Sequence, residues 1–235
     1  MKQFGAPLGD WNAPAAPEFT ELQGRFATLE RLDTRHAHEL YRAYSGADEV
    51  FDYLPYGPFS SESGYIRWVG ERATQTDPYL LAVRDIATDM VGGVMGLLRI
   101  DTAGGVVELG HINLAPSLQG TTTASEAMIL LITWAFSSGY RRFEWKCDAL
   151  NLPSRRAAQR LGLSYEGVFR QAAHYKGRNR DTAWFAATDQ DWSALQVAYE
   201  AWLRPENFDD AGQQIERLSD LTRLVRVSSD PALAR

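Results

Sequence analysis

The sequence predicts an α+β protein built on a mixed, mostly antiparallel sheet that is flanked by helices. Runs with strand-like alternation follow one another at 79–85, 91–100 and 106–114, and the short, turn-rich segments between them are typical of an antiparallel meander. A long apolar stretch at 124–138 then separates the last of these runs from another strand-like run at 142–148. This order indicates a β-α-β unit, whose strand ends frame a crevice where we expect a ligand.

The composition argues against several classes of function. The 235 residues are 45% hydrophobic and 23% charged and carry a net charge of -6, so we expect neither nucleic acid nor an anionic membrane as a partner. The single cysteine, Cys147, cannot form an internal disulfide or a thiolate zinc site, and the four histidines are too scattered for a metal motif. The longest apolar run, 127–136, has about half of the ~20 residues that span a bilayer. With no signal-peptide pattern at the first residues, we expect a cytoplasmic protein without a metal ion.

The first part of the chain is expected to contain an arm, a strand and two helices. Residues 1–18 are rich in Gly and Pro and predict an extended arm, with Phe4 and Trp11 as its anchors. Alternation over 25–32 predicts the first strand, and Thr34 is the expected cap of a helix that ends near residue 45. Ser60 or Ser61 is expected to open a second helix that reaches about Thr76.

The remaining elements close the body and extend it. Asn151 is expected to begin a helix that stops at Gly162, and the runs 167–175 and 182–188 predict a hairpin around a turn at 176–181. The chain thus divides into an arm at 1–18, a domain at 19–190 and a helical extension at 191–235. The extension carries an apolar stripe, which includes Leu195 and Trp202. That stripe needs cover from the chain itself or from a second copy, so a homodimer is one expected assembly.

The turn between the strand at 106–114 and the apolar helix has two interpretations. Short polar residues lead directly into a buried helix, whose first amides have no internal partner and carry partial positive charge. A pyrophosphate bound there gains hydrogen bonds and dipole energy together. Alternatively, Thr123 and Glu126 form a capping box that satisfies the same amides. The local sequence leaves both interpretations open.

The order of several motifs resembles the GNAT acyltransferase family, and in particular its RimJ/RimL branch, over residues 20–190. The segment Gln119-Gly120-Thr121-Thr122-Thr123-Ala124 is similar to the Gln/Arg-x-x-Gly-x-Gly/Ala signature that holds the pyrophosphate of acetyl-CoA in that family. The further matches are Glu108-Leu109-Gly110-His111, Asn151-Leu152-Pro153-Ser154, Leu161-Gly162-Leu163, Glu166-Gly167 and Arg170. The resemblance implies a GNAT-type sheet and acetyl transfer from acetyl-CoA to a primary amine of a small molecule or a protein N-terminus. It implies direct transfer in a ternary complex, without metal.

The resemblance also implies a set of residues that bind the co-substrate. They are Asn113, Leu114, Gln119, Gly120, Thr121, Thr122, Thr123, Ala124, Asn151 and Ser154. One position departs from the family, because Thr122 replaces the usual glycine and narrows both the backbone conformation and the approach to the phosphates. We expect binding to be retained, with the threonine hydroxyls as additional donors, although a degenerate loop without the co-substrate is the alternative.

Acyl transfer to an amine needs a base, an oxyanion donor and a proton for the departing thiolate. By resemblance, Ser154 supplies the proton and a main-chain amide near Asn113 or Leu114 stabilises the oxyanion. Glu108 and His111 are the candidate bases. They lie three residues apart on a strand and therefore face opposite sides, so only one reaches the pocket directly unless a bulge intervenes.

Other residues leave alternatives open. His174 on the hairpin, or water, can replace Glu108 and His111 as the base, and Cys147 is expected in the core, which disfavours a covalent mechanism. Three aromatic residues form either a wall for the acceptor or part of the core, and they are Tyr53, Tyr56 and Trp68.

The basic residues of the hairpin are either solvated, or they bind an acidic acceptor or the 3′-phosphate of the co-substrate. These residues are Arg170, Lys176, Arg178 and Arg180. Two other functions are alternatives to acetyl transfer. The chain is either a non-catalytic acyl-CoA-binding or regulatory module, or a transferase that uses another donor such as succinyl-CoA.

Overall fold

Eight strands form one continuous sheet in the computed structural model, which describes residues 2–234. The sheet order is β1-β2-β3-β4-β5-β6-β8-β7, and every neighbouring pair is antiparallel except β5 and β6. The strands are β1 (Glu21–Gln23), β2 (Ala27–Arg31), β3 (Tyr79–Asp85), β4 (Met90–Asp101), β5 (Val106–Leu114), β6 (Arg142–Asp148), β7 (Ser164–Tyr175) and β8 (Arg178–Thr188). The predicted α+β class, its meander and its β-α-β unit are confirmed.

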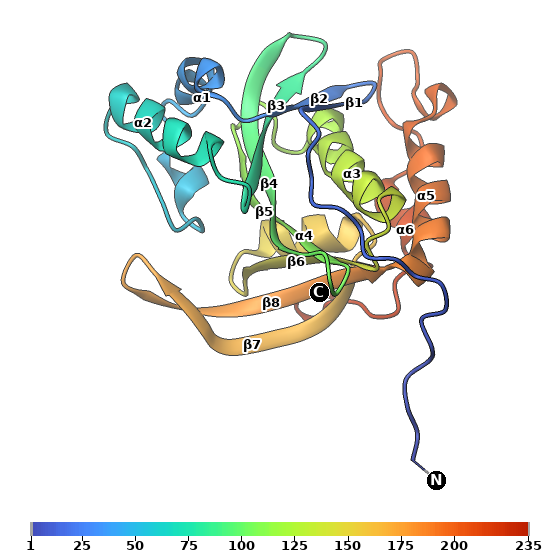
Figure 1. Ribbon diagram of the computed structural model, residues 1–235. Helices are drawn as coiled ribbons and strands as arrows, with labels where there is room; N and C mark the ends of the chain where they lie inside the picture. Colours follow the sequence, from blue (N-terminus) through green and yellow to red (C-terminus); the bar gives the residue numbers. More distant parts are fainter. Residues whose placement is uncertain (1, 235) are drawn as a thin grey trace.

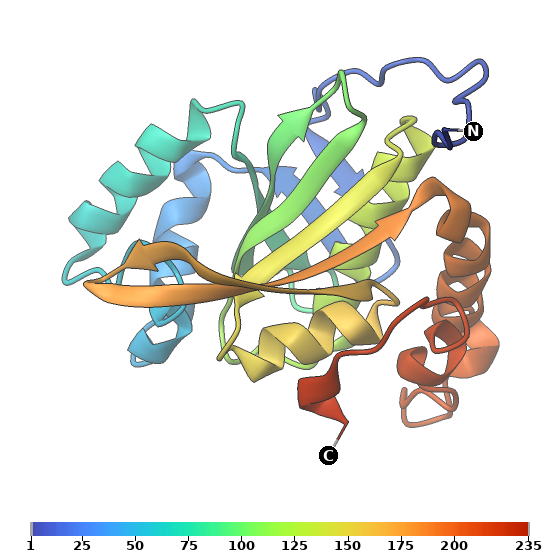
Figure 2. The ribbon, with the colours of Figure 1, turned by 90° about the horizontal axis from the view of Figure 1, so that it is seen from below.

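Helices cover both faces of this sheet (Figures 1 and 2). The α-helices are α1 (Ala37–Ala43), α2 (Glu62–Ala73), α3 (Thr122–Ser137), α4 (Leu152–Arg160), α5 (Asp189–Leu203) and α6 (Leu218–Thr222). The 3-10 helices are η1 (Thr34–His36), η2 (Asp48–Phe51), η3 (Pro205–Asn207) and η4 (Pro231–Leu233). Helices α1 and α2 pack on one face, and α3, α4 and α5 pack on the other.

Side-chain alternation along the strands creates the two cores. On β6, Phe143, Trp145 and Cys147 enter the core beneath α3, so Lys146 and Asp148 point to the face of α1 and α2. Helix α3 is buried on nearly every side because it lies between the sheet and α5, as the apolar residues on nearly every side of it predict.

The parallel strands β5 and β6 separate before they end. They pair only from Val106 with Arg142 to Leu109 with Trp145, whereas both strands continue beyond that point. The unpaired ends leave a crevice between β5 and β6 that connects the two faces of the sheet. A crevice at the carboxyl ends of parallel strands is a common location for a ligand.

Several element boundaries differ from the sequence predictions. Asp33 and not Thr34 caps the first helical segment, because its carboxylate accepts from the amide of Arg35. The hairpin turn contains only residues 176–177, since β8 already begins at Arg178. The three-residue strand β1 went unpredicted, because so short a segment shows no alternation.

The two ends of the chain pack against the body. In the arm, Trp11 donates from Nε1 to the carbonyl of Gly139 at 3.0 Å, but Phe4 is 87% exposed and is wrong as an anchor. At the other end, Leu195, Tyr199 and Trp202 of α5 join the core beside α3. The apolar face of α5 therefore finds its cover within the chain, whereas Ile215 and Leu224 of the extension are exposed. No helix among residues 2–234 has both the length and the apolar character needed to cross a membrane.

Candidate active site

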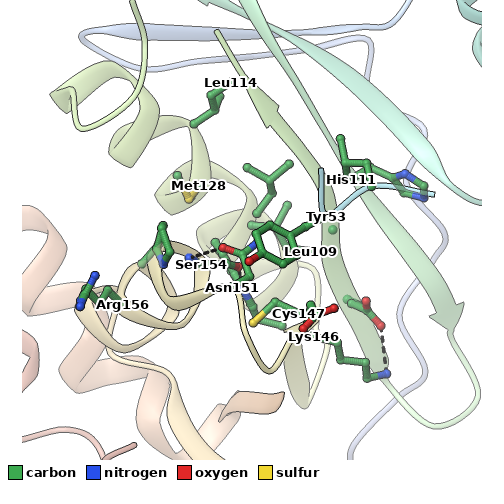
Figure 3. Close-up of a pocket in the computed structure, with 18 of the residues that line it drawn as sticks. Tyr53, Leu109, His111, Leu114, Met128, Lys146, Cys147, Asn151, Ser154 and Arg156 are labelled. Carbon is green, nitrogen blue, oxygen red and sulfur yellow. Dashed lines mark hydrogen bonds and ion pairs between the residues drawn. The ribbon is translucent and has the colours of Figure 1, made fainter. Parts of the chain in front are cut away.

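A cavity of about 950 Å³ occupies the crevice between β5 and β6. Its wall combines the ends of these strands with the start of α3, one side of α4, residues 49–55 and the hairpin of β7 and β8. In Figure 3, Asn151 and Ser154 line one side of this cavity, His111 lies on the opposite side and Tyr53 lies between them. The cavity thus reaches side chains of both faces of the sheet.

A β-bulge in β5 brings both candidate bases to the cavity. Gly110 pairs with Gly96 and Asn113 with Val94, so His111 and Ile112 together face a single residue of β4. His111 has a φ of +52°, which is unusual for a residue other than glycine. Because the bulge resets the alternation, Glu108 and His111 both line the cavity. The bulge at His111 and Ile112 directly precedes Asn113, one of the two positions named from sequence for the oxyanion amide.

The turn into α3 presents three backbone amides to a ligand. In the part of the chain that the structure describes, the N–H groups of Gly120, Thr122 and Thr123 have no acceptor. Gly120 has a φ of +74°, and a Cβ placed there would meet no atom within 4 Å, so the backbone is open at this point. These amides stand at the N-terminus of a 16-residue helix, whose dipole favours an anion. The arrangement fits a pyrophosphate.

The predicted capping box of Thr123 and Glu126 is wrong. The cap is Thr121, whose hydroxyl accepts from the amide of Ala124 at 3.1 Å. Glu126 instead accepts from the three amides of residues 25–27, at 2.6–2.9 Å, and so fastens α3 to β2. Neither Thr123 nor Glu126 therefore accepts a hydrogen bond from the amides of the turn.

Thr122 is the one signature threonine with a hydroxyl that makes no hydrogen bond within residues 2–234. The Thr121 hydroxyl also donates to the carbonyl of Leu118, and that of Thr123 donates to Asp85 at 2.6 Å. Thr122 begins α3 with a helical backbone, so this position needs no glycine for a positive φ. The expectation of three threonine donors thus narrows to Thr122 alone.

Ser154 lies where its hydroxyl can donate into the cavity. Trp145 donates from Nε1 to the Ser154 Oγ at 2.9 Å, and an oxygen that accepts in this way keeps its own hydrogen for another partner. Asn151 caps α4 by accepting from the amide of Ser154 at 3.1 Å, which orients this first turn. Burial raises the pKa of the neighbouring Cys147 to about 11, which keeps that thiol protonated at neutral pH.

Glu108 is buried within a network of ion pairs. Its carboxylate contacts Arg99 and lies 2.9 Å from the Nζ of Lys146, which also pairs with Glu144 at 2.6 Å. Arg142 extends the network to Glu144, at 2.6 Å. The Glu108 carboxylate that lines the cavity therefore has two cationic partners.

His111 is held as a neutral imidazole. Burial, followed by the charges of Arg72 and Arg99, lowers its pKa from 6.5 to about 4. Its ring stacks on that of Tyr56 with 5.6 Å between centroids, and Nδ1 lies 3.3 Å from the Tyr56 hydroxyl. His174, the third histidine considered, is exposed on β7 and does not line the cavity.

A family model matches the part of the sequence that forms most of this cavity. The model of the acetyltransferase (GNAT) domain matches residues 27–164, which is more than half of the chain. The chain belongs to the GNAT acetyltransferase family. Its enzyme class is therefore that of acyl-CoA-dependent acetyltransferases, and the fold expected from the resemblance is confirmed.

Other acetyltransferases are similar to this chain over most of their length. A GCN5-related N-acetyltransferase from Brucella melitensis is 42% identical, with 92% of this chain and all of that chain covered and a TM-score of 0.89. A probable GNAT acetyltransferase from Chromobacterium violaceum is 37% identical, covering 83% of this chain and 98% of that one, with a TM-score of 0.77. An uncharacterized N-acetyltransferase p20 from Bacillus licheniformis is 28% identical over 170 residues, covering 71% of this chain and 94% of that protein.

Most co-substrate residues named from this GNAT sequence gather around the cavity. Those that line it are Leu114, Gln119, Gly120, Ala124, Asn151 and Ser154. Thr121, Thr122 and Thr123 form the adjoining first turn of α3 without lining the cavity itself. Asn113 is buried beside the bulge, where its carbonyl accepts from the hydroxyl of Tyr44 at 3.0 Å, and its side chain does not reach the cavity wall.

Sequence reasoning missed two arginines of α4. Arg156 and Arg160 line the cavity, and in residues 2–234 neither has a carboxylate partner. Arg160 donates to Ser125 at 2.9 Å, and burial lowers its pKa. The i, i+4 spacing that places both on one side of α4 was readable, but which side faces the cavity was not. Among those same residues there is no cluster of three or more side chains able to hold a metal ion.

The aromatic residues divide between wall and core. Tyr53 lines the cavity, whereas Tyr56 stacks between Trp68 and His111 in the core beneath α2. Of the basic hairpin group, Arg180 alone lines the cavity. Lys176 donates to the carbonyl of Phe51 at 2.8 Å, and Arg178 is exposed.

Proposed function

We propose that the protein is an N-acetyltransferase that moves the acetyl group of acetyl-CoA to a primary amine by direct transfer in a ternary complex. The observation that carries the proposal is the cavity in the β5–β6 crevice, which has Gly120 and the adjoining first turn of α3 at one end and polar side chains of the opposite face at the other. Two substrates that approach from opposite faces can meet there without a covalent enzyme intermediate. The raised pKa of Cys147 supports the same choice.

The co-substrate half is the side of α3 and α4. The amides of Gly120, Thr122 and Thr123 would hold the pyrophosphate, with Arg156 and Arg160 as positive charges beside it. Once bound, acetyl-CoA supplies an activated thioester carbonyl. The chemistry of the donor set supports this fit, because uncommitted amides and unpaired guanidinium groups are suited to phosphate.

The residues near the reacting atoms have separate roles in this proposal. Ser154 donates its free hydrogen to the sulfur that leaves, and the bulge at His111 directs main-chain groups of β5 toward the carbonyl oxygen. Glu108 accepts the proton of the amine, directly or through water. His111 has a pKa of about 4, too low for an effective base at neutral pH, and is better suited to shaping the wall.

We further propose that the chain belongs to the RimJ/RimL-like branch. The spacing of Asn151 and Ser154, with the Asn151 side chain capping the helix that carries Ser154, supports this assignment. The acceptor is then an amine of a small molecule or of a protein N-terminus.

Calorimetry with acetyl-CoA, followed by thiol release with a panel of amines, tests the proposal. We expect binding and amine-dependent release of coenzyme A in equal amounts with acetylated product. Binding without amine-dependent release would instead indicate an acyl-CoA-binding module. A higher kcat/KM with succinyl-CoA than with acetyl-CoA would change the donor but keep the mechanism.

A further inference from the structure

Strand β8 contributes part of the cavity wall, and two hydrogen-bond donors in this part have no acceptor among the described residues. Arg180, Thr182 and Trp184 alternate along β8, so they share one face of the sheet, and all three line the cavity. Across residues 2–234, the buried Nε of Arg180 and the buried Nε1 of Trp184 have no hydrogen-bond acceptor. Buried donors are rarely left without a partner in proteins, so these two indicate a group that is supplied by a ligand.

The charge of Arg180 is also uncompensated. Neighbouring cations on the same face have partners, since Lys146 contacts Glu108 and Glu144, and Arg99 contacts Glu108. Within the described residues, Arg180 forms no ion pair. A partly buried guanidinium without a carboxylate is a ready binding site for an anion.

Arg180 lies in the half of the cavity opposite the free amides of α3. The register of β6 and β8 places Trp184 opposite Lys146 and Thr182 opposite Asp148, on the face that carries α1 and α2. Arg180 is two residues further along β8, toward the hairpin turn. The phosphates would be held on the other face, at α3 and α4, so the donors of β8 belong to the acceptor half.

Contacts between loops narrow this half. The Nζ of Lys176, at the hairpin turn, donates to the carbonyl of Phe51 at 2.8 Å, and the Tyr53 hydroxyl lies 3.4 Å from the carbonyl of Leu150. Both contacts link residues 49–55 to elements on the far side of the cavity. This enclosure favours a small acceptor over a folded protein.

We propose that Arg180, together with the indole N–H of Trp184, binds a carboxylate of the acceptor, so that the substrate is a small primary amine that also carries a carboxylate, as an amino acid does. This inference rests on the proposed acetyl transfer and specifies its acceptor. The planar guanidinium can donate two parallel hydrogen bonds to a carboxylate. An acceptor that carries a neutral amide in its place leaves the cation of Arg180 uncompensated, and this loss gives the discrimination.

Steady-state kinetics with amino acids and the corresponding amino acid amides test this assignment. Arg180→Gln should lower kcat/KM for the acids at least tenfold and for the amides less than threefold, and Arg180→Lys should restore part of the loss. Comparing the acid-to-amide ratio between variants cancels the different pKa values of the two amines. Trp184→Phe should reduce the same ratio to a smaller extent, and Arg178→Gln is the matched control on the same strand. An equal loss for acids and amides in Arg180→Gln would overturn the assignment.

A binding measurement separates this inference from the proposed function. N-acetylated amino acids and their amides are titrated by calorimetry into the protein saturated with coenzyme A. We expect the acids to bind at least tenfold more tightly than the amides, and this preference to disappear in Arg180→Gln while coenzyme A binding is unchanged. Preferential binding of the acids without any acetyl transfer would refute the proposed function and retain the carboxylate site. Equal binding of acids and amides by the unmodified protein would refute the site, whatever the activity.

Discussion

Arg155 donates two hydrogen bonds to the two carboxylate oxygens of Asp230, one from Nε and one from Nη2, each at 2.6 Å. The two side chains are only 7% and 0% exposed, and the pairing raises the pKa of Arg155. Arg155 belongs to α4, whose first turn carries Ser154, whereas Asp230 caps the last 3-10 helix of the chain. The C-terminal segment is thereby fastened to the helix that forms one wall of the cavity.

Asp230→Asn should destabilise the fold, because it leaves the buried guanidinium of Arg155 without a compensating charge. Breaking one partner of a buried ion pair costs about 3–5 kcal/mol, so we expect a loss of about 3 kcal/mol in the free energy of unfolding. Denaturant unfolding measures this value. Asp220→Asn is the control, since Asp220 is exposed on the same C-terminal segment and should change stability by less than about 0.5 kcal/mol. An equal effect of both substitutions would refute the role of the pair.

The partner of Arg155 was not readable from the sequence, because a distance of 75 residues along the chain separates it from Asp230. The elements with local signals were predicted well. The meander, α3 and the Asn151 cap each depend on alternation, apolar content or capping within a few residues. The burial of Leu195 and Trp202 against α3 depends on how distant elements pack, so the sequence showed only that the stripe needed cover.

Replacing Gly120 should weaken the binding of coenzyme A. Proline has no amide hydrogen and requires a φ near −65°, whereas Gly120 has a φ of +74° and a free amide. We expect the dissociation constant measured by calorimetry to rise at least tenfold in Gly120→Pro. Gly212→Pro is the matched control, because Gly212 has a similar φ of +73° in a loop that does not line the cavity. Unchanged affinity in Gly120→Pro would contradict the proposed phosphate site.

Ser154→Ala should lower kcat more than it changes the KM for acetyl-CoA. The hydroxyl is proposed to donate to the leaving sulfur, an interaction that develops only as the reaction proceeds, so its loss should reduce kcat by about 10²-fold. Trp145→Phe removes the indole donor that orients this hydroxyl and should give a smaller reduction in the same direction. If Ser154→Ala turned over at the normal rate, Ser154 would have no role in the chemistry.

Glu108→Gln should lower turnover at neutral pH and alter the pH profile of kcat/KM. The substitution removes the proposed proton acceptor and also takes a carboxylate from Lys146, which retains Glu144 as a partner. Rates should therefore be compared after unfolding experiments have shown the variant to be folded. A reduced rate with an unaltered pH profile would assign the proton transfer to water or another group.

The bulge in β5 shows why the catalytic side of the site was harder to predict than the turn. Strict alternation places Glu108 and His111 on opposite faces, and both reach the cavity only because one extra residue interrupts the pairing with β4. Whether a strand contains such a residue depends on its neighbours in the sheet. The turn before α3 could be interpreted from sequence because its amides follow from the helix beginning there.

His111 should make the stability of the protein depend on pH between about 4 and 6.5. Burial lowers the pKa of His111 from 6.5 to about 4, so in this range the unfolded chain binds a proton that the folded chain does not. The free energy of unfolding should therefore rise with pH through this window, by at most about 1.4 kcal/mol per pH unit for this one group. Above about 6.5 the imidazole is neutral in both states and does not affect stability. As the pH falls toward 4, the unfolded chain binds the proton first, and the free energy of unfolding decreases.

Denaturant unfolding at several pH values measures this effect. The rise with pH should be shallower in His111→Asn, because asparagine tolerates a positive φ and does not titrate, while His174→Asn at an exposed position should keep the slope of the unmodified protein. Identical slopes in His111→Asn and the unmodified protein would show that His111 titrates normally in the folded state.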